Sequence, residues 1–298
     1  MNIFVLIKQE IFTAQFDKAV GSKALPACIV SGLSLYDRYA LEQAARIKEA
    51  KAKADHSEVN VIALAVCRFR EDKQTARDAL VDALSMAADE AFLVCGAYEE
   101  AGSEAASDGG VFEPADAQWD GKLFAQAVKK ICGRSGAEQG GWFVLDGEQE
   151  YDGSVSVAGP TAAESLGIPS VTGAAEIAGQ EGQGSLLVRR EAGGFTESIE
   201  TPFPAVITIG KSIYEPRLAT FPRIRRANRM EISYLNISNP DADRAGLMGR
   251  TGPKTRVEAF FRSARAGERI LIREETEEDS ARRFMELLRE RIIAEQLF

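Results

Sequence analysis

The sequence predicts an α/β fold built on a doubly wound, mostly parallel sheet. Apolar, β-favouring runs at Asn2–Ile7, Val59–Val66 and Ala91–Cys95 alternate with segments whose apolar residues recur at helical spacing. Val59–Val66 is nearly continuous in apolar residues, as expected for a strand covered on both faces. The chain has 298 residues, 45% of them hydrophobic, which is enough for a large core in one or two domains.

Three segments predict the helices between these strands. Ser34 and Asp37 fit the capped start of a helix that ends in a lysine-rich stretch. Residues 73–87 and 119–131 also carry apolar residues on one helical face. Alternation of strands and helices favours parallel strands joined by helical crossovers.

Residues 142–169 read as strand, loop and helix. The apolar run Trp142–Leu145 is followed by a polar loop with several glycines, and Pro160 suits the first turn of a helix. At the carboxyl edge of an open sheet, such a helix start can bind a nucleotide phosphate. No phosphate-binding consensus with fixed glycine spacing is present, so an ordinary strand-to-helix connection is the preferred interpretation of the loop alone.

The second half of the chain changes in character. Leu186–Arg190 and Thr196–Glu200 flank a glycine-containing turn and predict a β-hairpin, and Pro204–Ile209 predicts a further strand. After Met230 there are few signals until a short predicted strand at Ile270–Arg273 and a final helix. That helix is long enough to embrace a partner subunit, and packing within the chain is the equal alternative; its apolar face comprises Phe284, Leu287, Leu288 and Ile292.

Residues 215–226 form a basic, proline-bounded segment on an otherwise acidic chain. The formal net charge of the chain is −9, so this cluster of arginines stands out. It is either a solvated basic turn or a docking loop in which Phe221 anchors in a partner's pocket. The arginines that would steer such a partner are Arg217, Arg223, Arg225 and Arg226.

Composition excludes several classes of function. The acidic balance argues against nonspecific binding to nucleic acid or to acidic membranes. No apolar run approaches a membrane span, and Met1–Lys8 lacks the features of a signal peptide, so we expect a soluble, cytoplasmic protein without membrane insertion. The cysteines have no paired spacing and there is one histidine, so we expect no metal site and no catalytic triad.

Several separated segments resemble the electron transfer flavoprotein β-subunit family. Residues 2–9 are similar to the family's first strand, and residues 36–44 to its first helix start. More specific are Pro204–Thr208, Glu215–Arg217 and Ala219–Pro222, in the order and spacing of the family's signature. The resemblance covers residues 1 to about 230. A tail containing residues 246–249 and 253–257 resembles electron-bifurcating members.

The resemblance implies a Rossmann-like sheet of the adenine nucleotide alpha hydrolase-like type. Residues 1–230 would form the nucleotide-binding α/β domain, and residues 231–298 a C-terminal arm packing on the partner. That partner would be an α subunit holding FAD, in a heterodimer that carries electrons from flavin dehydrogenases to a quinone oxidoreductase or a ferredoxin-type acceptor. The β subunit itself would bind AMP or, in bifurcating members, a second FAD.

The same resemblance assigns residues by position. Tyr36 would lie near the flavin ring of the α subunit, and Phe221 replaces the leucine usual in the family's docking loop. Ser154, Val155 and Val157 stand where relatives carry Asp, Thr and Gln. Valines donate no hydrogen bonds, so the loop is compatible with a bound nucleotide and with its loss. The implied cofactor contacts are Leu6, Ser34, Leu35, Tyr36, Asp37, Val66, Gly147, Asp152, Gly153, Ser154, Val155, Ser156, Val157 and Ala158.

The sequence is compatible with three functions. The first is an electron carrier subunit with no catalytic residues of its own. The second is a scaffold subunit with a degenerate nucleotide site, which the valines at 155 and 157 favour. The third is an adenine-nucleotide-using enzyme on the same fold, for which the sequence shows no convincing nucleophile or phosphate loop.

Overall fold

The computed structural model describes residues 1–12, 29–54, 58–67, 72–96, 117–135, 141–149, 156–179, 184–211, 214–237 and 270–295. The chain divides into two compact units, Met1–Phe260 and Phe261–Phe298. Each is described by itself.

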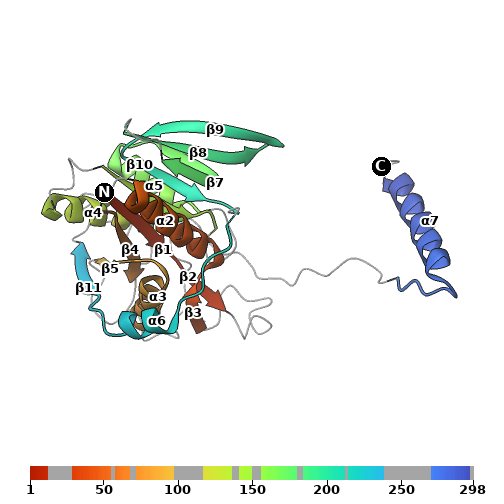
Figure 1. Cartoon of the computed structure of the whole chain (residues 1–298), viewed down its shortest axis with the longest axis horizontal. Coiled ribbons are helices and arrows are strands. Elements are labelled where there is room, and N and C mark those ends of the chain that lie inside the picture. Colours follow the sequence, from red (N-terminus) through yellow and green to blue (C-terminus); the bar gives the residue numbers. More distant parts are fainter. Residues whose placement is uncertain are drawn as a thin grey trace, which may run out of the picture. The chain divides into compact units, whose positions relative to one another are not determined.

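The first unit is built on a nine-stranded sheet (Figure 1) in the order β11-β5-β4-β1-β6-β10-β7-β8-β9. All neighbours from β11 to β7 are parallel, and β8 and β9 join the edge as an antiparallel hairpin. This confirms the predicted fold class. The strands are β1 (Asn2–Ile7), β4 (Asn60–Cys67), β5 (Glu90–Gly96), β6 (Trp142–Gly147), β7 (Ser170–Gly179), β8 (Ser185–Ala192), β9 (Phe195–Pro202), β10 (Ala205–Ile209) and β11 (Ser233–Ile237).

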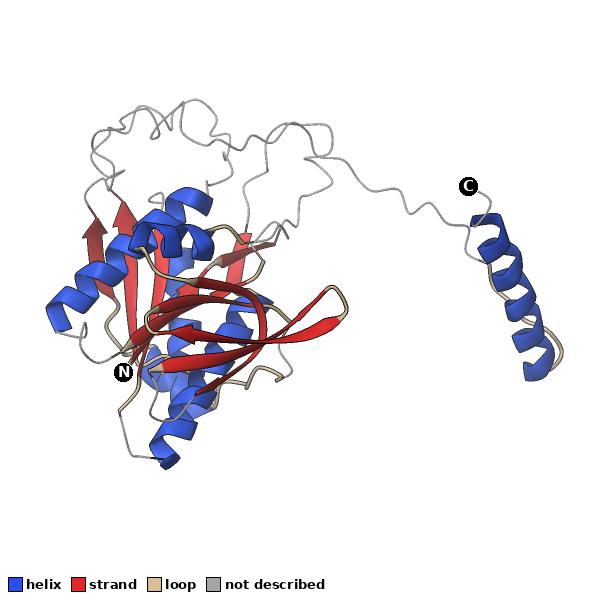
Figure 2. Cartoon of the chain, turned by 90° about the horizontal axis from the view of Figure 1, so that it is seen from above, coloured by secondary structure: helices blue, strands red, loops and turns tan. Residues whose placement is uncertain are grey.

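Helices cover both faces of this sheet, as a doubly wound fold requires. On one face, α2 (Leu35–Ala54) and α3 (Asp72–Met86) bury alanines and leucines against the strands. On the other face lie α4 (Ala117–Ser135) and α5 (Ala158–Leu166). In the view from above, the hairpin strands extend past these helices (Figure 2). The seven-residue helix α6 (Phe221–Ala227) packs beside α3.

Four strands of the structure were not predicted. β7 is rich in glycine and alanine, and these residues give little strand signal even when they are buried in a sheet. β11 pairs with β5, so the sheet continues beyond residue 230, where the sequence placed the domain boundary. The remaining two, β2 (Gln9–Phe12) and β3 (Ile29–Leu33), form a small antiparallel sheet of their own.

The second unit contains α7 (Glu277–Glu295), which confirms the predicted final helix. Its start is capped by Thr276, whose Oγ1 accepts a hydrogen bond from the N–H of Asp279. The predicted strand at Ile270–Arg273 is wrong, because these residues are irregular and Leu271 is almost fully exposed. Within the described parts of the chain, no helix has the length and apolar character to cross a membrane.

Candidate functional site

The direction of strand order changes between β1 and β6, which are neighbours in the sheet. β1 is followed along the chain by β4 and β5 on one side, whereas β6 is followed by β7, β8, β9 and β10 on the other side. In open α/β sheets, ligands bind at the carboxyl ends of the strands beside this switch point. Lys8 directly follows β1 and Asp146 lies near the end of β6, so both occupy this edge.

Lys8 is buried and its charge is paired. Its Nζ donates hydrogen bonds to Oδ1 of Asp146 at 2.6 Å and to the carbonyl oxygen of Gly147 at 2.5 Å. A longer contact of 3.4 Å reaches Oγ of Ser156. A buried ammonium is costly unless it is paired and hydrogen-bonded, and these contacts meet that requirement.

Asp146 connects this lysine to the start of α5. Its Oδ2 accepts hydrogen bonds from the hydroxyl of Ser156 at 2.7 Å and from the N–H of Gly159 at 3.0 Å. Gly159 lies in the first turn of α5, where the positive end of the helix stabilises a carboxylate. A Cβ at Gly159 would lie 2.6 Å from the same Oδ2, so only glycine permits this approach.

Asp37 completes the buried cluster from the first turn of α2. Ser34 caps this helix, since its Oγ accepts the N–H of Asp37 at 3.0 Å, as predicted. Oδ2 of Asp37 accepts the backbone N–H of Lys8 at 2.7 Å. Burial raises the pKa of Asp37 to about 7, although the charge of Lys8 opposes the shift. Among the described residues, its Oδ1 has no hydrogen-bond partner.

Gly147 allows α2 and β6 to meet at this edge. A Cβ there would lie 2.8 Å from Oδ1 of Asp37 and 2.9 Å from atoms of Tyr36. Contacts this short do not occur for real Cβ atoms, so the position requires glycine. The structure thereby brings together Gly147, Tyr36 and Asp37, which the sequence placed in one site from segments far apart in the chain.

The other predicted cofactor residues have mixed surroundings. Leu6 and Ala158 are fully buried, whereas Leu35 and Val157 are exposed. Tyr36 packs edge-on against Tyr39. Val66 is buried near the end of β4, and Ser156 is buried beside Asp146. The predicted contacts Asp152, Gly153, Ser154 and Val155 lie outside the described residues.

The first arginine of the predicted docking segment, Arg217, binds its own chain. Arg217 donates from Nε and Nη2 to the carboxylate of Glu42, and its backbone N–H reaches the same group. A further ion pair joins it to Glu49. Burial alone would raise the pKa of Glu42, but the hydrogen bonds from Arg217 outweigh it and hold that pKa below its usual value. Arg217 thus fixes the segment to α2.

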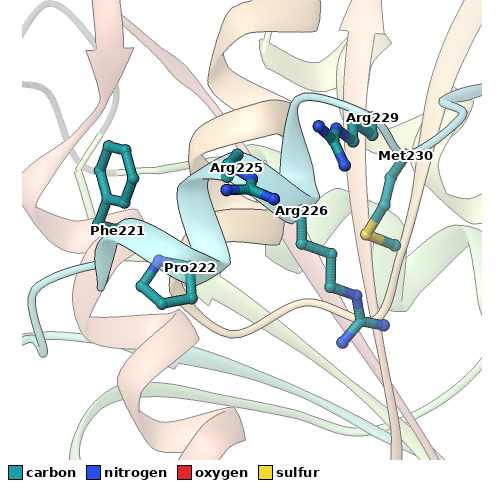
Figure 3. Close-up of a pocket in the computed structure, with 6 residues that line it drawn as sticks. All are labelled: Phe221, Pro222, Arg225, Arg226, Arg229 and Met230. Carbon is teal, nitrogen blue, oxygen red and sulfur yellow. The ribbon is translucent and has the colours of Figure 1, made fainter.

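Beyond Arg217 the segment presents apolar side chains to solvent. Leu218 is 86% exposed and Phe221 is 75% exposed, and Ile224 is partly exposed. Residues 221–227 form α6 instead of a loop, because Pro222 suits a first helical turn. Along α6, Phe221 and Pro222 stand at its start (Figure 3), beside a surface pocket whose other lining residues are Arg225, Arg226, Arg229 and Met230. Arg223 belongs to the same helix and is exposed.

Sequence reasoning missed Lys8, Asp146 and Glu42. Lys8 and Asp146 each interrupt or end an apolar strand, and a charge at a strand end is usually solvated. The signal that could have identified them is a pair of opposite charges at the carboxyl ends of two parallel strands. Glu42 gave no such signal, because its partner Arg217 lies 175 positions away in sequence.

Comparison with known proteins assigns the family. The electron transfer flavoprotein domain model matches residues 30–240. A protein named electron transfer flavoprotein subunit beta from Thermoanaerobacterium thermosaccharolyticum is 30% identical over 278 residues, covering 90% of this chain and 91% of that protein. The chain belongs to the electron transfer flavoprotein β-subunit family.

Two other relatives are similar to this chain over nearly its whole length. The electron transfer flavoprotein subunit beta of Megasphaera elsdenii is 28% identical over 298 residues, covering all of both chains. The protein FixA of Azorhizobium caulinodans is 27% identical over 275 residues, or 91% of this chain and 88% of its own. The similarity to electron transfer flavoproteins therefore continues beyond residue 240, where the family model ends.

Proposed function

We propose that this chain is the β subunit of a heterodimeric electron transfer flavoprotein, working in the cytoplasm. An α subunit would hold the FAD, and the pair would carry electrons from flavin dehydrogenases to a quinone oxidoreductase or a ferredoxin-type acceptor. The bound flavin supplies the redox chemistry, and the residues of this chain position the partners. The part of residues 231–298 that follows β11, including α7, would serve as the arm that packs on the α subunit.

The observation that carries this proposal is the surface around α6. Three apolar side chains, Leu218, Phe221 and Ile224, are exposed beside arginines on a protein of net charge −9. Exposed aromatic anchors with adjacent arginines are typical of the centre of a protein interface. The attachment of Arg217 to Glu42 and Glu49 holds the segment in place before a partner arrives, which lowers the entropy cost of docking.

The buried polar residues support a carrier more than an enzyme. Lys8, Asp37 and Asp146 lie at the switch point, but they are buried, and both carboxyl groups are paired with Lys8. A general acid or base must reach the proton that it transfers, and a nucleophile needs access to its substrate. We therefore assign these three residues to the architecture of the site, and the alternative of an adenine-nucleotide-using enzyme is not favoured.

Co-purification tests the proposed function. The chain would be expressed with the electron transfer flavoprotein α subunit of the same genome, and the purified complex would be examined by visible spectroscopy. We expect a stable one-to-one complex with a flavin spectrum that is bleached by a reduced flavin dehydrogenase. Failure to associate, or a colourless complex, would refute the proposal.

A further inference from the structure

The N-terminus of α5 is where a nucleotide phosphate would be expected in this fold. Backbone N–H groups and the helix dipole converge there, and both favour an anion. The strand before this helix, β6, ends at the switch point of the sheet. The fit of a phosphate therefore depends on what the groups at this helix end already bind.

Two of these groups already bind an anion that the chain supplies. The N–H of Gly159 and the hydroxyl of Ser156 both donate to Oδ2 of Asp146. The N–H of Ser156 donates to the carbonyl oxygen of Glu148, and Pro160 has no N–H to offer. The carboxylate of Asp146 thus takes hydrogen bonds that a phosphate oxygen would otherwise accept.

The nearby cation is engaged in the same way. Lys8 directs its Nζ at Oδ1 of Asp146, so one carboxylate joins the lysine to the helix end. Asp37 adds a second carboxyl group 3.8 Å from the same Nζ. The side chains of Val157 and Ala158, which come next at the helix start, have no hydrogen-bond donors.

Binding of a phosphate at this position would be strongly unfavourable. Its charge would lie beside the carboxylate of Asp146 in a buried setting, where like charges repel strongly. Removing Asp146 from the helix end would also leave Lys8 buried without its closest counter-charge, which is costly. The described residues of the crevice consequently do not fit a bound phosphate at the start of α5.

We propose that Asp146 is a built-in substitute for the ligand phosphate, and that the crevice between β1 and β6 retains neither AMP nor a second FAD. This inference rests on the proposed function and specifies the ligand state of the same site. The heterodimer then carries only the flavin of its α subunit. Electron bifurcation through a flavin in the β subunit is excluded by the same argument.

Nucleotide content of the wild-type heterodimer is the first test. The purified complex with the α subunit would be denatured, and released FAD and AMP would be separated by chromatography and quantified per heterodimer. We expect one FAD and no AMP. One AMP, or a second FAD, would overturn the inference while leaving the proposed function intact, whereas absence of all flavin would instead refute the proposed function.

An Asp146→Asn variant tests whether Asp146 is the cause. Asparagine keeps the size and can still accept from Gly159, but it removes the negative charge that excludes a phosphate. We expect AMP and inorganic phosphate to raise the unfolding temperature of this heterodimer and to leave the wild type unchanged. The matched control is Asp89→Asn. Asp89 directly precedes β5 and is paired with Lys48 of α2, so this variant should gain no response.

The outcomes of this second test are also decisive. If AMP changes the unfolding temperature of the wild type and of Asp146→Asn equally, or changes neither, the inference is overturned. If the variant fails to assemble, the nucleotide content of the wild type decides alone.

Discussion

The backbone N–H of Lys8 donates a 2.7 Å hydrogen bond to Oδ2 of Asp37, and so joins the end of β1 to the first turn of α2. The same carboxyl group is fully buried, and its pKa is raised to about 7, mainly by loss of solvation. In the unfolded chain this group would titrate near its ordinary value, which is about 3.9. The two states therefore bind different numbers of protons between these values.

The first prediction concerns the pH dependence of stability. Because the folded state holds the proton of Asp37 more tightly, stability falls as pH rises from about 4 to about 7, and the contribution is flat above and below. An Asp37→Asn variant keeps a hydrogen-bond acceptor and removes this titration. Denaturant midpoints of both proteins at about pH 5 and about pH 8 should show a larger loss for the wild type. Parallel pH profiles would contradict the assignment.

The second prediction concerns the close approach at Gly147. Gly147→Ala would place a Cβ 2.8 Å from Oδ1 of Asp37 and 2.9 Å from Tyr36, so α2 or β6 must shift. We expect a loss of about 1–3 kcal/mol in the free energy of unfolding, measured by chemical denaturation. Gly133→Ala in α4 is the control, because nothing lies within 4 Å of its added Cβ. That variant should be neutral or more stable, by up to about 1 kcal/mol.

The third prediction concerns the attachment of the docking segment. Arg217→Ala would leave the carboxylate of Glu42, which is 2% exposed, with Arg46 as its ion-pair partner among the described residues. We expect a loss of about 1–3 kcal/mol in the free energy of unfolding, as when a buried acceptor loses its donor, and slower electron transfer from the dehydrogenase, because the segment is no longer held.

The control for this loss is Arg189→Ala. Arg189 forms a more exposed ion pair with Glu176, and exposed pairs contribute little to stability, about 0–1 kcal/mol. Equal effects of the two substitutions would show that the attachment to Glu42 has no special role.

The fold was more predictable than the site because its signals are local. The continuous apolar run of β4 and the helical spacing in α2 need no knowledge of distant residues. β7 was not predicted, because its glycines and alanines adopt the strand conformation only through pairing with β10 and β8. Where a segment contains many large apolar residues, its local sequence pattern is enough to predict its secondary structure. Elsewhere the secondary structure depends on tertiary contacts.

Some residues of the site could be predicted from the sequence, and others could not. Its predicted members came from a family resemblance, and the structure places Tyr36, Asp37 and Gly147 in contact. Lys8 and Asp146 are separated by 138 positions, and each looks solvated in its own segment. Only the parallel pairing of β1 with β6 shows that the two charges meet in the interior. The ligand state of the crevice therefore depends on contacts that no local pattern reveals.

The last prediction concerns the aromatic side chain of the docking surface. Phe221 is 75% exposed at the start of α6, so Phe221→Ala should leave stability nearly unchanged. If it anchors the dehydrogenase, its loss should reduce the second-order rate of flavin reduction about ten- to a hundredfold, as for an interface hot spot. Phe195→Ala is the matched control, since Phe195 is 76% exposed at the turn of the hairpin. Stopped-flow reduction of the heterodimer distinguishes them: flavin content should be the same in both variants, and only Phe221→Ala should react slowly. A loss of flavin from Phe221→Ala, or equal rates for the two variants, would contradict the docking role.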